Sequence, residues 1–516
     1  MNSPMKLQRR DFIKGMVAIP VLGFFAAGVK GNISKQVDKK TIDYYKRLKI
    51  DRLEAPLEKL TPPTGTKGKR IRIGLVGCGW RGQALLQKFG YLHSDVIEQH
   101  TKNGEPSNWL RNLMTQEDLN VEVTGICDVF DVHTQRGVDI SRHNVYPGNT
   151  REPKTAEVFQ SYRDMVKSEN IDAILIATPD HTHVPMAIAA ANAGKHVYLE
   201  KPMAQSIEAA IALRDTIKKC NVVFQVGHQN RQQMSYKVGR ELFQKGLLGD
   251  VTQVETFTNR NTVDGAWIRD DVRDHKLGNE SNINWKEFLH DAPWVEFDRK
   301  RFFSWQRYSE YGTSVTGNDF AHWFDCVNQV LDLGIPESVM AMGGQYYYKT
   351  HGDMPDVLNA IFSYPERGLS LTYDATLKNG NFRQSRILGS EATLDLDSAV
   401  RMYKDRYSEK FSEVKLTGEE PLYYYDPNTD IDAISTATSR TYFKGGYGPT
   451  FIDGKIIDVT FLHVKEWIDA IRGVGKPSCD IDKGFEESVT FNLANLAYVH
   501  KKPVRWDKVN EKAIIG

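Results

Sequence analysis

The sequence has few cysteines and no excess of charge of either sign. Only five of its 516 residues are cysteine, and they lie far apart along the chain. An odd and sparse set argues against a disulfide framework and against a zinc site. Lys and Arg number 67 and Asp and Glu number 66, so no global basic excess indicates a nucleic acid or an anionic membrane as a partner.

Long apolar runs, repeats of solenoid length and low-complexity tracts are also missing. The hydrophobic fraction of 40%, the aromatic fraction of 10% and the charged fraction of 26% are ordinary values. They exclude a mostly disordered chain and a multi-span membrane protein. At roughly 100–200 residues per domain, the length predicts two to four domains in a large globular protein.

The N-terminus has the features of an export signal. Arg9 and Arg10 precede an apolar run from Met16 to about Val29. This run is shorter than the roughly 20 apolar residues that cross a bilayer, and the paired arginines resemble a twin-arginine signal. We therefore expect residues 1–30 to direct the protein to the periplasm, with membrane contact only through an uncleaved signal. The alternative is a basic tail before a core helix.

A glycine-rich turn follows the first strong strand pattern. Residues 69–76 alternate and then run apolar, which predicts a buried parallel strand. The turn is G-x-G-x-x-G, formed by Gly77, Gly79 and Gly82, and a helical stretch follows it. Such glycines permit a tight turn and a close approach of the backbone to a pyrophosphate, which then meets a helix N-terminus. The placement between strand and helix predicts a dinucleotide site.

An acidic residue ends the next predicted strand. The apolar stretch 121–127 stops at Asp128. A carboxylate there would accept hydrogen bonds from the adenosine ribose hydroxyls and favour NAD over NADP. Asp128 lies 46 residues after Gly82, whereas about 20 is usual, so we expect an insertion over about 90–118. The alternative role for Asp128 is a helix N-cap.

Strands and helices continue to alternate after this point. Strand patterns over 171–177, 195–199 and 222–226 enclose helix patterns over 184–193 and 207–220. This alternation predicts a doubly wound parallel sheet, an α/β fold that binds ligands at the carboxyl ends of its strands. Polar or glycine-containing segments follow those strand ends at 77–82, 128, 178–183 and 200–201.

Three of these segments resemble a known family. The turn 77–82, the run A-T-P-D-H-T-H over 177–183 and the run A-G-K-H-V-Y-L-E-K-P over 193–202 look like those of the Gfo/Idh/MocA family of NAD(P)-dependent oxidoreductases. Its namesakes are glucose–fructose oxidoreductase and inositol dehydrogenase. The resemblance covers roughly residues 70–500, and the twin-arginine start and the helix containing 492–498 look like those of exported members.

The resemblance implies a fold, a cofactor and a substrate class. We expect a signal at 1–30, a lead-in segment at 31–68, an NAD-binding Rossmann domain at 69–227 and an α+β domain with a large open sheet at 228–516. The substrates implied are sugars, cyclitols or their derivatives, and a homo-oligomer is a further family expectation. The residues expected to bind NAD are Gly77, Gly79, Trp80, Arg81, Gly82, Asp128, Thr178, Pro179, His183, Glu200 and Lys201.

Lys201 occupies the position of the family's catalytic lysine. A hydride leaves a carbinol carbon for the nicotinamide, and a base must take the hydroxyl proton. Lys201 would be that base or a proton relay. The alternative is a lysine bonded to a strand-end carbonyl. We reject a metal at the nearby His181/His183 pair, because no other ligands accompany it at convincing positions.

The second half carries a helix with a polar stripe. Residues 318–331 have helical spacing, and Asn318, His322 and Asp325 share one face. His322 matches the family's catalytic histidine, but Asn318 replaces the aspartate that many members carry four residues earlier. Asn318 can hydrogen-bond a sugar hydroxyl but cannot take a proton, and Asp319 would substitute for it or cap the helix. A structural role is expected for Asp325, and a buried structural histidine is the alternative for His322.

Alternating patterns in this half predict a mainly antiparallel sheet. Gln229 and Arg231, which follow the last strand of the first half, face either a ligand or solvent. The predicted strands of the sheet are 251–258, 337–348, 357–363, 368–376, 382–388 and 392–396.

Two further functions stay open beside a sugar or polyol dehydrogenase. One is a glycosidase that oxidises, eliminates and reduces with bound NAD. The family branch that does this lacks the lysine that Lys201 supplies here, which favours the dehydrogenase. The other is a non-catalytic NAD-binding module.

Overall fold

A computed structural model describes most of the chain from Gly68 onward. The described residues are 68–147, 154–261, 273–349, 352–397, 399–414, 421–426, 431–433, 449–452 and 455–516. The expected signal at 1–30 and nearly all of the lead-in segment at 31–68 lie outside them. Within the described residues, no helix combines the length and the apolarity that crossing a bilayer needs.

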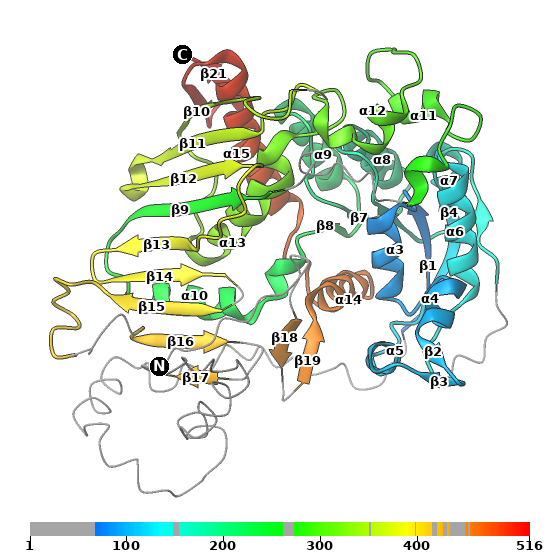
Figure 1. Ribbon diagram of the computed structural model, residues 1–516, viewed down its shortest axis with the longest axis horizontal. Coiled ribbons are helices and arrows are strands. Elements are labelled where there is room, and N and C mark those ends of the chain that lie inside the picture. Colours follow the sequence, from blue (N-terminus) through cyan, green and yellow to red (C-terminus); the bar gives the residue numbers. More distant parts are fainter. Residues whose placement is uncertain are drawn as a thin grey trace, which may run out of the picture.

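The first half forms the predicted parallel sheet (Figure 1). Six strands pair in the order β5-β4-β1-β6-β7-β8, and every pairing is parallel. The doubly wound fold predicted from the alternation of strands and helices is therefore confirmed. The strands are β1 (Ile71–Val76), β4 (Val121–Cys127), β5 (Glu157–Val158), β6 (Ala173–Ile176), β7 (His196–Leu199) and β8 (Phe224–Val226).

Helices pack against this sheet and against each other. Helix α3 contacts α6, and α8 contacts α9. The expected insertion lies between α3 and β4 and holds two short helices and a two-stranded ribbon. The elements are α3 (Trp80–Gln87), α4 (Ser94–Gln99), β2 (Thr101–Lys102), β3 (Glu105–Pro106), α5 (Asn108–Met114), α6 (Asp131–Arg142), α7 (Tyr162–Met165), α8 (Asp180–Asn192) and α9 (Ile207–Lys219).

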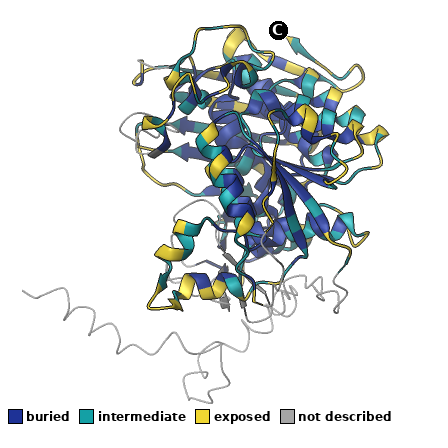
Figure 2. Ribbon diagram, turned by 90° about the vertical axis from the view of Figure 1, so that its right-hand side faces the viewer, coloured by how far each residue is buried: buried dark blue, intermediate teal, exposed yellow. Residues whose placement is uncertain are grey.

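The central strands are apolar because both faces of the sheet are covered. All four residues of β6 are buried, as are five of the six in β1. Figure 2 shows these strands as a buried band between helices whose outer faces are exposed. A run with no polar alternation is what a sheet covered on both faces requires.

The second half builds an eleven-stranded sheet in the order β17-β16-β15-β14-β13-β9-β12-β11-β10-β20-β21. All its pairings are antiparallel except the parallel pair β9–β12. The six predicted strands are present, although β10 ends earlier than expected, at Gly344. The strands are β9 (Val251–Asn259), β10 (Ser338–Gly344), β11 (Val357–Tyr364), β12 (Leu369–Thr376), β13 (Ser385–Gly389), β14 (Ala392–Leu396), β15 (Val400–Lys404), β16 (Tyr423–Asp426), β17 (Ile431–Ala433), β20 (Val504–Asp507) and β21 (Lys512–Ile515).

Helices line the face of this sheet that is turned toward the first half (Figure 1). Helix α10 packs on β14 and β15, and α15 packs on β10. Both helices contact α13. The remaining helices and strands are η1 (Gln229–Gln232), α10 (Met234–Gln244), η2 (Arg273–Lys276), α11 (Trp285–Leu289), α12 (Arg299–Phe303), η3 (Trp305–Arg307), η4 (Thr316–Phe320), α13 (Ala321–Leu331), η5 (Pro365–Arg367), β18 (Pro449–Ile452), β19 (Lys455–Asp458), α14 (Val459–Ile471) and α15 (Ile481–His500).

Two parts of the second half pack on the first. The segment 273–312, here called the excursion, carries a hydrophobic cluster that encloses Phe130, next to the end of β4. Helix α14 lies along the β8 edge, where the His463 ring hydrogen-bonds the carbonyl oxygen of Val226 at 2.9 Å. The division at residue 227 stays a prediction, because the two halves share these contacts.

The buried His463 makes the α14–β8 contact sensitive to acid. Burial, with the charges of His228 and Arg231, lowers the pKa of His463 to about 3. As the pH falls, the unfolded chain therefore takes up this proton at a higher pH than the folded chain does. The contribution to the free energy of unfolding is fully present above the ordinary pKa of about 6.5 and is lost as the pH falls toward 3. At pH 5 this loss is about 2 kcal/mol.

We expect His463→Gln to lose less thermal stability than the unmodified protein between pH 7.5 and pH 5, because the Gln amide can still donate to Val226 but does not titrate. Thermal unfolding midpoints at the two pH values measure this. The exposed His500, changed to Gln, is the control. Equal acid losses in all three proteins would contradict the prediction.

Candidate functional site

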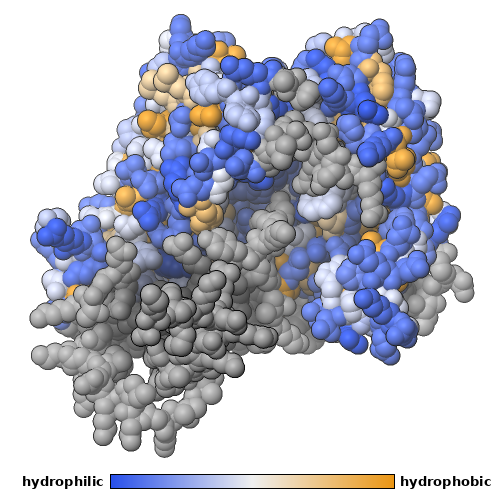
Figure 3. Space-filling model, in the orientation of Figure 1, coloured by the Kyte–Doolittle hydropathy of each residue, from blue (hydrophilic) through white to orange (hydrophobic). Residues whose placement is uncertain are grey.

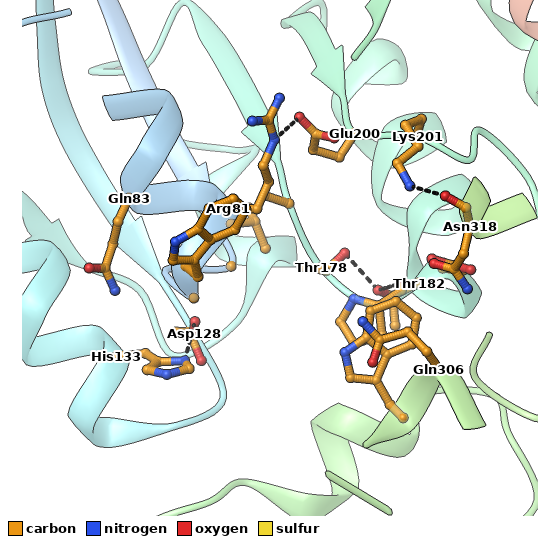
Figure 4. Close-up of a pocket in the computed structure, with 18 of the residues that line it drawn as sticks. Arg81, Gln83, Asp128, His133, Thr178, Thr182, Glu200, Lys201, Gln306 and Asn318 are labelled. Atoms are coloured by element: carbon orange, nitrogen blue, oxygen red, sulfur yellow. Dashed lines mark hydrogen bonds and ion pairs between the residues drawn. The ribbon is translucent and has the colours of Figure 1, made fainter. Parts of the chain in front are cut away.

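A deep cleft of about 1240 Å³ lies where the two halves meet. Its walls include the glycine turn, the ends of β4, β6 and β7, helix α13 and the excursion. Figure 3 shows the surface hollowed between the two halves. In Figure 4, Asp128 and His133 lie at one end of the cleft, and Lys201 and Asn318 lie at the other.

The glycine turn owes its shape to backbone packed against backbone. Gly77 has a φ of +89°, which favours glycine, and a Cβ there would lie 2.4 Å from the carbonyl oxygen of Ala177. A Cβ on Gly82 would lie 2.0 Å from the Gly77 oxygen. At Gly79 the nearest atom to such a Cβ is a His133 ring carbon at 3.7 Å, which is an ordinary contact. Gly77 and Gly82 are thus required by the turn itself, whereas Gly79 leaves space in the cleft.

Asp128 ties the end of β4 to this turn. One oxygen accepts the Cys78 N–H at 2.6 Å, and the other accepts the Phe130 N–H at 2.9 Å. The N-cap residue of α6 is Phe130, so the helix-cap alternative for Asp128 is wrong. A carboxylate has about four lone-pair positions, so each oxygen can still accept a hydroxyl from the cleft.

Arg81 and Glu200 form an ion pair across the cleft, as Figure 4 shows. Arg81 Nε lies 2.6 Å from Glu200 Oε1, and Glu200 is buried. Gln229 donates to the same oxygen at 3.2 Å and to the Tyr198 hydroxyl at 2.8 Å. Gln229 is therefore a buried brace for Glu200 and does not face solvent. Trp80, by contrast, is 63% exposed on the wall of the cleft.

Thr178 and Pro179 lie on the cleft wall, but His183 does not. Thr178 accepts a hydrogen bond from Thr182 Oγ1 at 2.8 Å, and Pro179 is the N-cap residue of α8. His183 is 1% exposed, and its ring nitrogens lie 2.8 Å from the carbonyl oxygens of Pro202 and Thr178. We therefore expect His183 to hold two loops in place rather than to touch a cofactor.

Lys201 reaches across the cleft to the second half. Its Nζ donates to the backbone carbonyl oxygen of Asn318 at 2.9 Å. This carbonyl belongs to the π-helical turn η4 and not to a strand end, so the expected structural alternative for Lys201 is not what the structure contains. An ammonium group has three N–H donors, and two stay available to a ligand. Lys201 and Asn318 both line the cleft.

The π-helical turn also fixes the side chains of Asn318 and Asp319. Asn318 Nδ2 donates to the Ser314 carbonyl oxygen at 3.1 Å, and Asp319 Oδ1 accepts from Arg260 Nη2 at 2.5 Å. The N-cap residue of α13 is Phe320, so Asp319 pairs with an arginine instead of capping the helix. A single π turn inside a helix is often found at a functional site.

His322 lines the cleft one helical turn beyond Asn318. Burial, followed by the positive charge of Lys201, lowers its pKa well below the ordinary value, so the ring is neutral at pH 7. A neutral imidazole has one nitrogen that can accept a proton. His322 can therefore accept a hydrogen bond from a group held in the cleft, while its surroundings disfavour the protonated ring.

A buried group of four charges lies behind His322. His228 pairs with Glu487, and Arg231 pairs with Asp325. The ring centroids of His228 and His322 are 5.6 Å apart, with the rings edge to face. The ligand atoms of His228, Asp325 and Glu487 lie within 4.8 Å of one another, but each carboxylate already faces a cation. We interpret the group as an ionic network, which is in keeping with the structural role expected for Asp325. Arg231 is buried in it, away from solvent.

Sequence reasoning missed a second polar group beside Asp128. It consists of His133 and Arg136 on α6 and Asp274 from the excursion, and all three line the cleft. His133 and Arg136 lie one turn apart on α6, which begins shortly after Asp128, and this spacing is a signal that the sequence offered. Asp274 lies 138 positions beyond Arg136, and no local pattern marked it.

The fold and the cleft define the class of protein: a dinucleotide-binding Rossmann domain whose cleft is closed by a second, sheet-containing half. Comparison with family models agrees. Residues 71–228 match GFO_IDH_MocA, the oxidoreductase family with an NAD-binding Rossmann fold. The predicted resemblance to this family is thus supported for residues 71–228.

Curated relatives match less than half of the chain. A "Glycosyl hydrolase family 109 protein" from Shewanella baltica is 26% identical over 230 residues, 43% of this chain and 40% of the relative. A "Levoglucosan dehydrogenase" from Pseudarthrobacter phenanthrenivorans is 28% identical over 183 residues, 36% of this chain and 41% of the relative. The matches span about two fifths of these relatives.

A solved structure shows the same fold over a longer span. The WlbA dehydrogenase from Bordetella pertussis, solved with NADH and UDP-GlcNAcA, superposes with a TM-score of 0.53 at 18% identity. The superposition covers 85% of this chain and 99% of that one. The similarity therefore extends to the second half and confirms the predicted combination of a Rossmann sheet with a mostly antiparallel sheet.

The glycine turn predicts a difference between two alanine substitutions. Gly82→Ala puts a Cβ into the Gly77 oxygen, so we expect a lower thermal unfolding midpoint and loss of NADH binding. Gly79→Ala meets only ordinary contacts, so we expect an unchanged midpoint and NADH binding at least tenfold weaker, because a pyrophosphate must approach that backbone. Scanning fluorimetry and NADH fluorescence titration measure the two effects. Equal loss of stability in both variants would refute this assignment.

Proposed function

We propose that the protein is an NAD-dependent oxidoreductase that acts on a hydroxyl or keto group of a sugar, cyclitol or glycoside. One observation carries the proposal: a single cleft is lined by the glycine turn and Asp128 and also by Lys201 and the neutral His322. The levoglucosan dehydrogenase and WlbA relatives support the substrate class, since their names give a sugar and a sugar nucleotide.

The residues present suit NAD. The glycine turn leaves open space beside Gly79, and the N-terminus of α3 follows it with backbone N–H groups for a pyrophosphate. Asp128 retains acceptor positions for ribose hydroxyls and would repel a 2′-phosphate. These features support NAD over NADP. When bound, the nicotinamide accepts a hydride from a carbinol carbon or returns one to a carbonyl.

Lys201 and His322 would handle the proton. Lys201, held by the Asn318 carbonyl, directs its remaining N–H groups toward a substrate oxygen and orients it. Lys201 takes or relays the hydroxyl proton as the carbonyl forms, and the neutral His322, as its partner, accepts a hydrogen bond from the same hydroxyl. Asn318 and Asp319 orient the substrate by hydrogen bonding, since Asn318 has no proton to exchange and Asp319 pairs with Arg260.

Native mass spectrometry followed by a panel of sugars and polyols tests the function. We expect bound NAD in the purified protein and a rise in NADH absorbance with at least one compound. Protein without nicotinamide nucleotide that also fails to bind added NADH would overturn the proposal. Lys201→Met is the matched variant: we expect NADH binding within about threefold and kcat lower by at least 100-fold, because proton transfer contributes about 10²–10⁴-fold.

The family 109 relative keeps one second function in view, a glycosidase that uses bound NAD transiently. Release of a reducing sugar from a glycoside without net NADH would favour it. A non-catalytic NAD-binding module would instead show full binding and no turnover in either assay.

We propose, further, that the twin-arginine pattern exports the folded protein to the periplasm with NAD held tightly, since free NAD is scarce outside the cytoplasm. Replacement of Arg9 and Arg10 by lysine is expected to leave the protein in the cytoplasmic fraction on cell fractionation. An unchanged distribution would contradict export by this route. A variant of the protein that lacks residues 1–30 is the matched control.

A further inference from the structure

The polar group at the β4 end of the cleft joins both halves of the chain. Asp274, in the excursion, is 5% exposed. Its two oxygens accept from Arg136 Nη1 and Nη2, each at 2.5 Å, so the contact occupies both outer nitrogens of the guanidinium. The same carboxylate lies 3.1 Å from His133 Nε2. Asp274 therefore binds both cations that α6 presents to this end of the cleft.

His133 lies between two carboxylates. Its Nδ1 is 3.6 Å from Asp128 Oδ2, on the side away from Asp274. Burial opposes the charged ring, but the charges of Asp128 and Asp274 outweigh it and raise the pKa of His133 to about 9. At pH 7 the group thus holds two cations, His133 and Arg136, and two anions, Asp128 and Asp274. Its charges cancel.

This end of the cleft is where the adenosine ribose belongs, because the acid that follows the second strand of a Rossmann sheet reads the ribose hydroxyls. NADP differs from NAD by a phosphate on that ribose. A phosphate needs charge-assisted donors, and a planar guanidinium is the side chain that binds it best. Arg136 and His133 are the two cations of this group, and Asp274 pairs with both.

We infer that Asp274 is a cofactor-specificity residue, which denies a 2′-phosphate its cationic partners and keeps the cleft selective for NAD. The inference rests on the proposed function and deepens it, since it names a residue of the second half that discriminates between the two dinucleotides. Asp128 repels the phosphate directly. Asp274 adds to this by neutralising the groups that would otherwise attract it.

The position of Asp274 does not depend on its ion pairs alone. The excursion docks on the β4–α6 turn through two backbone hydrogen bonds, from Asp131 N to Asn282 O at 3.0 Å and from Asn284 N to Val129 O at 2.7 Å. A hydrophobic cluster around Phe130 lies beneath it. Asp274→Asn keeps the size of the side chain and removes its charge, so the excursion should stay docked.

Fluorescence titration with NADH and NADPH tests the inference without requiring turnover. The unmodified protein should prefer NADH. In Asp274→Asn we expect NADPH affinity to rise by roughly tenfold or more, the range of a charge-assisted hydrogen bond, while NADH affinity changes less than about threefold. Asp274→Asn combined with Arg136→Gln should lose that gain, because the freed guanidinium carries it. Raised salt should weaken the gain as well.

Two results would overturn the inference. One is an unchanged ratio of NADH affinity to NADPH affinity in Asp274→Asn. The other is an equal loss of both affinities, which would give Asp274 a purely structural role. A third result would have a different meaning. If the unmodified protein binds neither nucleotide, the proposed function fails and the inference fails with it.

Discussion

The carboxyl edge of one parallel sheet determines where the chemistry of this protein can occur. Parallel strands all end at the same edge, so segments far apart in the sequence meet there. The turn after β1, Asp128 after β4, Thr178 after β6 and Glu200–Lys201 after β7 meet in this way. The close approach of Gly82 to the Gly77 carbonyl lets the first of these segments turn sharply enough to leave room in the cleft.

Polar contacts at both ends of the cleft join the second half to the first, in addition to the hydrophobic cluster around Phe130. Lys201 donates to the Asn318 carbonyl at one end. At the other end Asp274 accepts from Arg136 and His133. Both contacts are polar and partly buried. Each therefore fixes the direction of approach between the two halves as well as their distance. A ligand that spans the cleft therefore meets groups positioned by both halves at each of its ends.

Local sequence patterns were sufficient to predict the strands and strand ends of the first half. Buried parallel strands are continuous apolar runs, and the residues at their ends are marked by glycine, proline or an acid, so the positions of Asp128 and Lys201 at strand ends follow from the sequence alone. The strands β15, β16, β17, β20 and β21 were not among the predicted strands. Each is only three to five residues long, which leaves little room for an alternating pattern. The π-helical turn at 316–320 is a single wider turn, too short to leave a periodic signal of its own.

Contacts between distant segments explain the remaining differences. His183 looked like a cofactor residue because it follows a strand end, yet its ring is used by two backbone carbonyls. Asp274 gave no signal in the sequence, because its role depends on its contacts with Arg136 and His133. These residues are far from it along the chain and meet it only in the folded protein. A side chain whose role depends on a partner in the other half is invisible to a pattern read along one strand or helix.

The ionic network behind His322 shows how such distant contacts reach the chemistry. Four charges are buried together, and burial of this kind is tolerated only when each charge is paired. Burial opposes a charged His228, but the carboxylate of Glu487 outweighs it and raises the pKa of His228, which favours the cationic ring. That cation lies edge to face with His322 and opposes a second positive charge there. Glu487 of α15, which does not line the cleft, thus helps to keep His322 neutral, as a hydrogen-bond acceptor at the cleft.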